Sequence, residues 1–172
     1  VVNRIVIYDY IALQQVCLSS NFDSFRKRAT VMYKLLLPVD GSPSAERAAR
    51  HVVELARVVG VMQVSLLNVQ PAVNAWEVKR FLREEEIAAM QSSLAEEATQ
   101  AARAILDQAG IGYQLHHLVG EVAESIAEFS DACGCKQIVM GSRGMGSLQG
   151  LLLGSTSTKV LHLVKVPVTL VK

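Results

Sequence analysis

This sequence has no large excess of positive or negative charge, few cysteines and no long hydrophobic run. Its 17 Lys and Arg residues balance 16 Asp and Glu residues, so a net charge of +1 gives no electrostatic reason to expect a nucleic-acid partner. No apolar run approaches the roughly 18 residues that a membrane-spanning helix needs. Three cysteines are a sparse and odd set, which favours a reducing cytoplasm over a disulfide framework.

Aromatic residues are also scarce, at 5% of the 172 residues, whereas apolar residues of all kinds reach 51%. Ala, Val and Leu dominate, and this composition suits helices that alternate with buried parallel strands. The length corresponds to one domain that is large enough to bury a full hydrophobic core.

The first 31 residues differ from the rest of the chain. Residues 5–13 are apolar but interrupted by Asp9, so they lack the unbroken apolar stretch of a secretory signal. Met32 stands just before the first strong strand pattern, and we expect the domain to occupy residues 32–172. Residues 1–31 are expected to be an extension that is weakly ordered or not native. A strand or helix packed on the domain, or an interaction arm, is the alternative.

Five apolar runs of strand length alternate with four helical patterns. We expect strands at residues 35–39, 64–69, 113–119, 138–140 and 168–171, and helices at 43–59, 81–109, 122–132 and 155–164. Ser42 and Pro43 suit the start of the first helix, and Gly60 and Gly134 suit helix ends. The order βαβαβαβαβ predicts an α/β fold, a doubly wound open sandwich with helices on both faces of a five-stranded parallel sheet.

A glycine-rich loop between the fourth strand and the last helix is the stretch best suited to hold an anion. It carries Gly141, Gly144, Gly146, Gly150 and Gly154. Glycines let backbone N–H groups turn toward a phosphate, and the helix start offers further unpaired N–H donors. A flexible surface loop is the plainer alternative, because glycine clusters are common there.

The spacing in this loop differs from the two common phosphate motifs. No G-x-x-x-x-G-K-[ST] occurs, and Gly144-Met145-Gly146 continues to Gly150, one residue off G-x-G-x-x-G. The spacing is instead Gly141-x-x-Gly144, nine residues, then Gly154-Ser155. With this spacing, and with segments 37–42, 66–69, 119–120 and 166–172, the chain resembles the ATP-binding branch of the universal stress protein family. The resemblance covers about residues 33–172.

The resemblance implies an adenine nucleotide alpha hydrolase-like fold with ATP as ligand, and Mg²⁺ held through the ATP phosphates. It assigns Asp40 to the ribose or the adenine side, Val69 to adenine and Met140 to the base pocket. The other nucleotide contacts that it implies are Pro38, Val39, Gly141, Arg143, Gly144, Gly154, Ser155, Thr156 and Ser157, of which the last seven would surround the phosphates.

The chemistry of the residues leaves some of these roles open. The Asp40 carboxylate suits sugar hydroxyls, but it would also serve as a cap for the helix that starts at Pro43. Arg143 would either pair with a phosphate or point into water. Asp40 and Gly141 face one crevice only if the first and fourth strands are neighbours, since parallel sheets bind ligands where the strand order reverses.

The chain departs from the family pattern just before the fourth strand. The family usually has an acidic residue there, whereas this chain has Gly134-Cys135-Lys136-Gln137. That position lies at the far end of the strand from the ligand, so local packing and capping are affected more than binding.

Several other groupings of reactive residues are better interpreted as structural. Cys133 and Cys135 have no further ligands nearby, and we interpret them as two small residues around a helix end instead of a metal or redox pair. His116 and His117 are adjacent on a strand, so they point to opposite faces and cannot chelate together. No catalytic triad or carboxylate pair is indicated by spacing.

Three classes of function fit these observations: a nucleotide-dependent regulatory module of the stress response, a slow ATPase or nucleotidyl-transfer enzyme, and a nucleotide-independent interaction module. Phosphoryl transfer needs charge neutralisation and a positioned nucleophile, and a loop with one arginine and no lysine argues against efficient turnover. The resemblance also implies a homodimer paired along the C-terminal strand, with Val166, Val168 and Leu170 at the edge. We expect a cytoplasmic protein with neither nucleic acid nor membrane as partner.

Overall fold

The computed structural model describes residues 33–72, 83–145 and 153–172. In chain order the elements are β1 (Tyr33–Pro38), α3 (Pro43–Val59), β2 (Met62–Gln70), α5 (Glu84–Gln108), β3 (Tyr113–Val119), α6 (Val122–Cys133), β4 (Gln137–Gly141), α7 (Ser155–Leu163) and β5 (Val168–Val171). The expected alternation of strands and helices is confirmed. The expectation for residues 1–31 lies outside the described residues. The expected start of the long helix at residue 81 is wrong, because Arg83 is an extended N-cap residue and α5 begins at Glu84.

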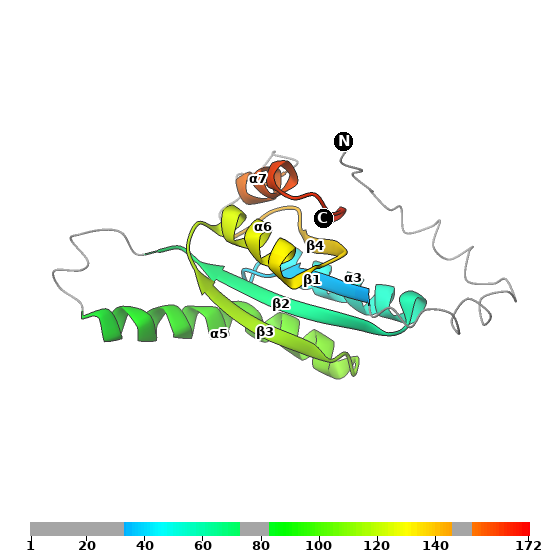
Figure 1. Ribbon diagram of the computed structural model, residues 1–172. Helices are drawn as coiled ribbons and strands as arrows, with labels where there is room; N and C mark the ends of the chain where they lie inside the picture. Colours follow the sequence, from blue (N-terminus) through cyan, green and yellow to red (C-terminus); the bar gives the residue numbers. More distant parts are fainter. Residues whose placement is uncertain (1–32, 73–82, 146–152) are drawn as a thin grey trace, which may run out of the picture.

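The five strands form one parallel sheet in the order β3-β2-β1-β4-β5. Figure 1 shows α5 along one side of β2 and β3, with α6 and α7 on the other side. The doubly wound α/β architecture that the sequence predicts is therefore confirmed. Within the described ranges, no helix combines the length and apolar character needed to cross a bilayer.

Two hydrophobic cores lie on opposite faces of the sheet, and β1 contributes to both. Leu35 and Leu37 pack with residues of α3 and α5, whereas Leu36 packs with residues of α6 and α7. Successive side chains of a strand point to opposite faces, so a run of three leucines at 0% exposure requires cover on both sides. The continuous apolar run in the sequence thus reflects a central, doubly covered strand.

Local capping signals set the helix boundaries near the site. The Ser42 hydroxyl accepts a hydrogen bond from the Ala45 amide at 3.2 Å, and Pro43 occupies the first turn of α3, as predicted. At the end of α6, Gly134 has a left-handed φ of 65°, a conformation that favours glycine, and its N–H bonds back to the helix.

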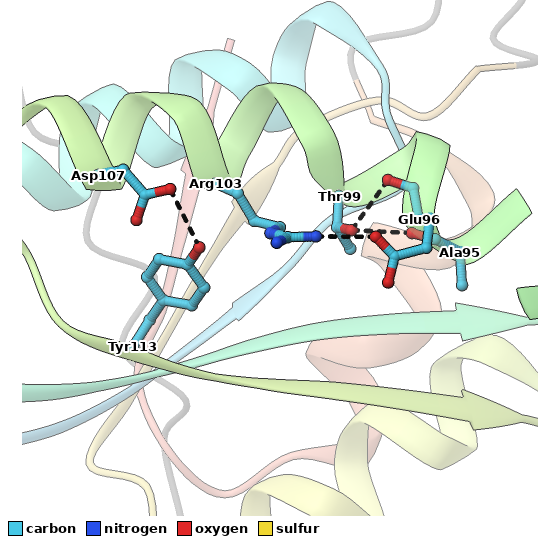
Figure 2. Close-up of polar contacts among 6 residues, drawn as sticks. All are labelled: Ala95, Glu96, Thr99, Arg103, Asp107 and Tyr113. Atoms are coloured by element: carbon cyan, nitrogen blue, oxygen red, sulfur yellow. Dashed lines mark hydrogen bonds and ion pairs between the residues drawn. The ribbon is translucent and has the colours of Figure 1, made fainter. Parts of the chain in front are cut away.

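Polar contacts within α5, and one from β3 to α5, help to hold this helix over one face of the sheet (Figure 2). The Tyr113 hydroxyl donates to Asp107 at 3.4 Å and so joins the first residue of β3 to α5. Arg103 and Glu96 form an ion pair at 2.8 Å on the exposed side of the helix. The buried Thr99 hydroxyl donates to the Ala95 carbonyl at 2.9 Å, which satisfies a polar group that burial would otherwise leave unpaired.

The strand order reverses beside β1. The chain leaves β1 for β2 on one side of it and later returns to β4 on its other side, where Leu35 and Leu36 pair with Gln137 and Ile138. The loops that follow β1 and β4 therefore diverge to opposite faces, and a crevice opens between them at the carboxyl ends of the strands. This neighbour relation, on which the shared crevice depends, is confirmed.

The two leucines of α5 provide a test of which helix face carries the stability. Leu106 is 0% exposed in the core beneath α3 and α5, whereas Leu94 is 45% exposed. We expect Leu106→Ala to lower the free energy of unfolding by about 2–5 kcal/mol, because a cavity replaces packed methyl groups. Leu94→Ala should change it by less than about 0.5 kcal/mol. Urea denaturation measures both, and equal losses would contradict this packing.

Candidate functional site

A cavity of about 260 Å³ opens where β1, β2 and β4 end, over the point where the strand order reverses. Most of the nucleotide contacts expected from the sequence line it: Pro38, Val39, Asp40, Val69, Met140, Gly141, Arg143, Gly144, Thr156 and Ser157. Gly154 and Ser155 lie just beyond the lining. The structure thus gathers these residues from three strands, two loops and the start of α7 around one space.

Asp40 faces the glycine loop across the crevice. One carboxylate oxygen, Oδ1, accepts the Ser42 N–H at 3.0 Å and orders the turn before α3. The other, Oδ2, lies so close to Gly144 that a Cβ added there would come within 2.8 Å of it. The side chain that caps α3 is Ser42, so the alternative role of Asp40 as the helix cap is not observed.

The first turn of α3 packs directly on the end of β4. A Cβ on Gly141 would come within 2.8 Å of the carbonyl carbon and the hydroxyl of Ser44. The Ser44 hydroxyl donates to the Arg143 carbonyl, and the Ser42 hydroxyl lies 3.4 Å from the same oxygen. Gly141 is therefore required for the contact between helix and strand, whatever ligand the loop binds.

Hydrogen bonds to the end of β4 fix the start of α7. The Ser157 hydroxyl, in a side chain at 2% exposure, lies 3.1 Å from the Gly141 carbonyl oxygen and 3.3 Å from that of Ser142. The Gly154 N–H also donates to the Ser142 carbonyl, at 2.8 Å. Ser157 thus contributes to the site as an internal tie, while Thr156 is half-buried and Ser155 is exposed. The first-turn N–H groups of α7 have no partner within the helix, which is the arrangement an anion uses.

Two amide side chains that the sequence did not indicate line the same cavity. Asn68 is 1% exposed and donates from Nδ2 to the Val39 carbonyl at 2.7 Å. Its oxygen accepts the Gln70 amide at 2.8 Å. The pair therefore holds the last residue before Asp40 against β2. The available signal was an asparagine within a mostly apolar strand, since a buried amide must find partners.

Apolar and polar residues both line the cavity. Val69, Met140 and the α6 residues Val122 and Ile126 pack in one hydrophobic cluster, and Asp40 and Arg143 are among the polar lining residues. Arg143 is an exposed residue whose carbonyl is bound to the serines of α3. Among residues 33–72, 83–145 and 153–172, no cluster of three His, Cys, Asp or Glu side chains is placed to hold a metal ion.

The interpretation of Cys133 and Cys135 as unbonded residues was wrong, because the two form a disulfide. Gly134 does end α6 as expected, and its left-handed turn brings the two Cα atoms to 5.5 Å, within the usual disulfide range. A one-residue gap does not indicate this pairing, since it depends on the conformation of the residue between. The disulfide lies before β4, at the opposite end of that strand from the cavity.

The fold and the crevice define a doubly wound α/β protein with a cavity at the point where its strand order reverses. The sequence profile of the universal stress protein family matches residues 32–172, and the chain belongs to this family.

Relatives and solved structures agree with this assignment. Universal stress protein MJ0531 of Methanocaldococcus jannaschii is 30% identical over 146 residues, which cover 81% of each chain. The solved structure of protein MJ0577 from the same organism has a TM-score of 0.70 and 31% identity, and covers 83% of this chain and 97% of that one. A universal stress protein of Archaeoglobus fulgidus, solved in complex with dAMP, has a TM-score of 0.59 and 26% identity, and covers 83% and 98% of the two chains.

The Asn68 amide provides a test of how the end of β1 is held. Asn68→Ala leaves the buried Val39 carbonyl without its donor, so we expect the free energy of unfolding to fall by about 1–3 kcal/mol. Gln63→Ala, on the same strand, removes only a partly exposed amide pair with Gln114 and should cost less than about 0.5 kcal/mol. Urea denaturation compares the two variants. A cost at residue 68 no larger than at residue 63 would argue against the tie.

Proposed function

We propose that this chain binds ATP in the crevice and acts as a nucleotide-dependent regulatory module in the stress response, as a cytoplasmic homodimer. The observation that carries the proposal is the close approach of the Asp40 carboxylate to Gly144 in the lining of a cavity that also contains apolar residues. A nucleotide presents the complementary groups in one molecule: an apolar base, a sugar with two hydroxyls, and anionic phosphates.

Each part of ATP has a counterpart in the lining. The base would lie against Val69, Met140 and Ile126, which provide the apolar surface that a purine needs. Oδ2 of Asp40, which has no hydrogen-bond partner among the described residues, would accept hydrogen bonds from the ribose hydroxyls.

The phosphates would extend toward Gly144, Arg143 and the first turn of α7, where backbone N–H groups and a positive helix end favour negative charge. Mg²⁺ would be held through the phosphate oxygens, which are ligands of the kind it prefers.

The relatives support the adenosine half of this proposal more directly than the triphosphate. The protein from Archaeoglobus fulgidus was solved with dAMP, which shares the base and most of the sugar with ATP. The longer phosphate chain of ATP would reach the glycine loop. The spacing of the glycines in this loop is the reason we favour ATP over a monophosphate.

Catalytic turnover is the weaker alternative. Arg143 is the one cationic side chain in the described lining of the cavity, and no histidine or second carboxylate accompanies Asp40 there. Phosphoryl transfer needs charge neutralisation around the phosphate and a group that positions the nucleophile. Slow hydrolysis at most is therefore expected, and binding itself would carry the signal.

The contact between Gly144 and Asp40 provides the test of binding. Gly144→Ala should displace the Asp40 carboxylate and weaken ATP affinity by roughly 10- to 100-fold, the cost of a charge-assisted hydrogen bond. Gly112→Ala, where a Cβ meets nothing within 4 Å, should bind like the unaltered chain. Calorimetric titration of nucleotide-free protein with ATP and Mg²⁺ measures both, with a dissociation constant near about 1 μM expected for the unaltered chain.

The outcomes separate the candidate functions. No binding to folded, nucleotide-free protein would favour the nucleotide-independent interaction module. Equal ATP affinity in the Gly144→Ala and Gly112→Ala variants would show that Asp40 does not contact the nucleotide. Gly141→Val cannot serve as a test of nucleotide binding. A side chain at this position would collide with Ser44 and disturb the fold, whereas a glycine in a flexible surface loop would tolerate the change.

The free edge of β5 is the proposed dimer contact. Val168 is 3% exposed within the chain's own core, so the backbone would have to make the pairing there. The carbonyls of Pro167 and Val171 accept hydrogen bonds from the β4 side. Backbone bonding alternates along a parallel strand, so the N–H and carbonyl groups of Val168 and Leu170 face outward.

We therefore expect Leu170→Pro to give folded monomers, because proline removes an outward N–H without removing a bond to β4. Leu170→Val keeps that N–H and serves as the matched control, so it should remain dimeric. Sedimentation velocity measures the assembly state, and circular dichroism checks the fold. A Leu170→Pro dimer as stable as the control would reject this edge.

A further inference from the structure

The Cys133–Cys135 disulfide joins a half-buried sulfur to a buried one. Cys133 is the last residue of α6 and is half-buried, whereas Cys135 is 4% exposed and belongs to the core formed with α6 and α7. The pair lies before β4, remote from the cavity at the other end of that strand. It takes no part in the proposed nucleotide site.

The backbone around the two cysteines is held independently of the sulfur–sulfur bond. The Cys135 N–H donates to the Ser130 carbonyl at 3.1 Å, and the Gly134 N–H donates to the Asp131 carbonyl at 3.2 Å. The Lys34 ammonium donates to the Cys133 carbonyl at 3.1 Å. These bonds would persist after reduction, so the two thiols would stay close enough to form the disulfide again.

Both sulfurs have surroundings that suit the reduced state. Cys133 Sγ lies 3.5 Å from the Ser130 carbonyl oxygen, which would accept the hydrogen of a thiol. Cys135 packs among apolar side chains, where a neutral thiol behaves as a small hydrophobic group. Neither state would therefore leave a buried charge or an unpaired strong donor.

The disulfide closes too short a loop to act as a major structural constraint. It links residues separated by two positions, and the stabilisation from restricting the unfolded chain grows with loop length. Two hydrophobic cores already hold β4 and α6 in place. The disulfide therefore adds little to the stability of the fold, and both cysteines are accommodated when it is reduced. Such a bond is suited to reversible chemistry.

We propose that Cys133 and Cys135 form a redox site that exchanges reversibly with low-molecular-weight thiols. The thiolate of a small thiol attacks Sγ of Cys133, the more exposed sulfur. The bond from Cys133 to Cys135 breaks as a mixed disulfide forms on Cys133, and the electron pair leaves on Cys135 Sγ, which takes up a proton. A second small thiolate attacks the small-molecule sulfur of the mixed disulfide, and Cys133 leaves as a thiolate that is then protonated. The balance is one protein disulfide and two thiols giving one protein dithiol and one small-molecule disulfide.

The redox behaviour is tested on the full-length chain carrying Cys17→Ser, which leaves only the two cysteines of the site. The folded protein is equilibrated in buffers with defined ratios of reduced to oxidised glutathione, alkylated, and analysed by mass spectrometry. We expect one reversible transition between a disulfide and a dithiol that takes up two alkyl groups. A pair that stays oxidised in every buffer, or stays reduced in every buffer, would overturn the proposal.

The direction of attack is tested by two single variants in the same background. With oxidised glutathione, Cys135→Ser should form a mixed disulfide on Cys133 rapidly, and Cys133→Ser should do so at least about tenfold more slowly on the buried Cys135, since exchange depends on access. Equal rates would contradict the role of Cys133 as the attacked sulfur.

A purely structural disulfide would behave differently on reduction. We expect the reduced protein to unfold cooperatively, with a melting temperature lowered by roughly 5 °C or less, because the closed loop is so short. Circular dichroism follows the transition in both redox states. Loss of cooperative unfolding in the reduced protein would mean that the bond stabilises the fold, and would overturn the proposal.

Discussion

The contact between α3 and the end of β4 is the constraint on which the site depends. Gly141 and Ser44 pack so closely that any side chain at position 141 would collide with Ser44. The Ser44 hydroxyl also donates a hydrogen bond to the Arg143 carbonyl. This contact fixes the path of the chain as it leaves β4 and so places Gly144 opposite Asp40. The ties from Asn68 to Val39 and from Ser157 to Gly141 act on the same strand ends from the neighbouring elements. The crevice is thus shaped by backbone positions more than by side chains that point into it.

The two ends of β4 have separate chemistry. Its carboxyl end enters the crevice, where glycine, hydroxyl and carboxylate groups meet. Its amino end follows the disulfide and the turn at Gly134. The doubly covered strand separates these two regions.

The sequence predicted the elements and the family because both depend on local patterns. Apolar runs and capping residues define β1 and α3, and the glycine spacing after β4 marks the loop. Other features depend on contacts that no local pattern encodes. The position of β4 beside β1 and the tie from Asn68 to the Val39 carbonyl both join segments far apart in the chain. The disulfide was missed for a different reason, because the left-handed turn at Gly134, and not the spacing of the cysteines, brings them together.

Because β1 lies at the centre of the sheet, between β2 and β4, its two neighbouring strands are synthesised at different times. The bond from Ser44 to Arg143 spans 99 positions, so one half of the crevice is made long before the other. A nascent chain that has produced only β1, α3 and β2 carries an unpaired, apolar strand edge where β4 will later bind. That edge is open to the wrong neighbour until the last third of the chain emerges from the ribosome. The crevice is therefore among the last features of the domain to form.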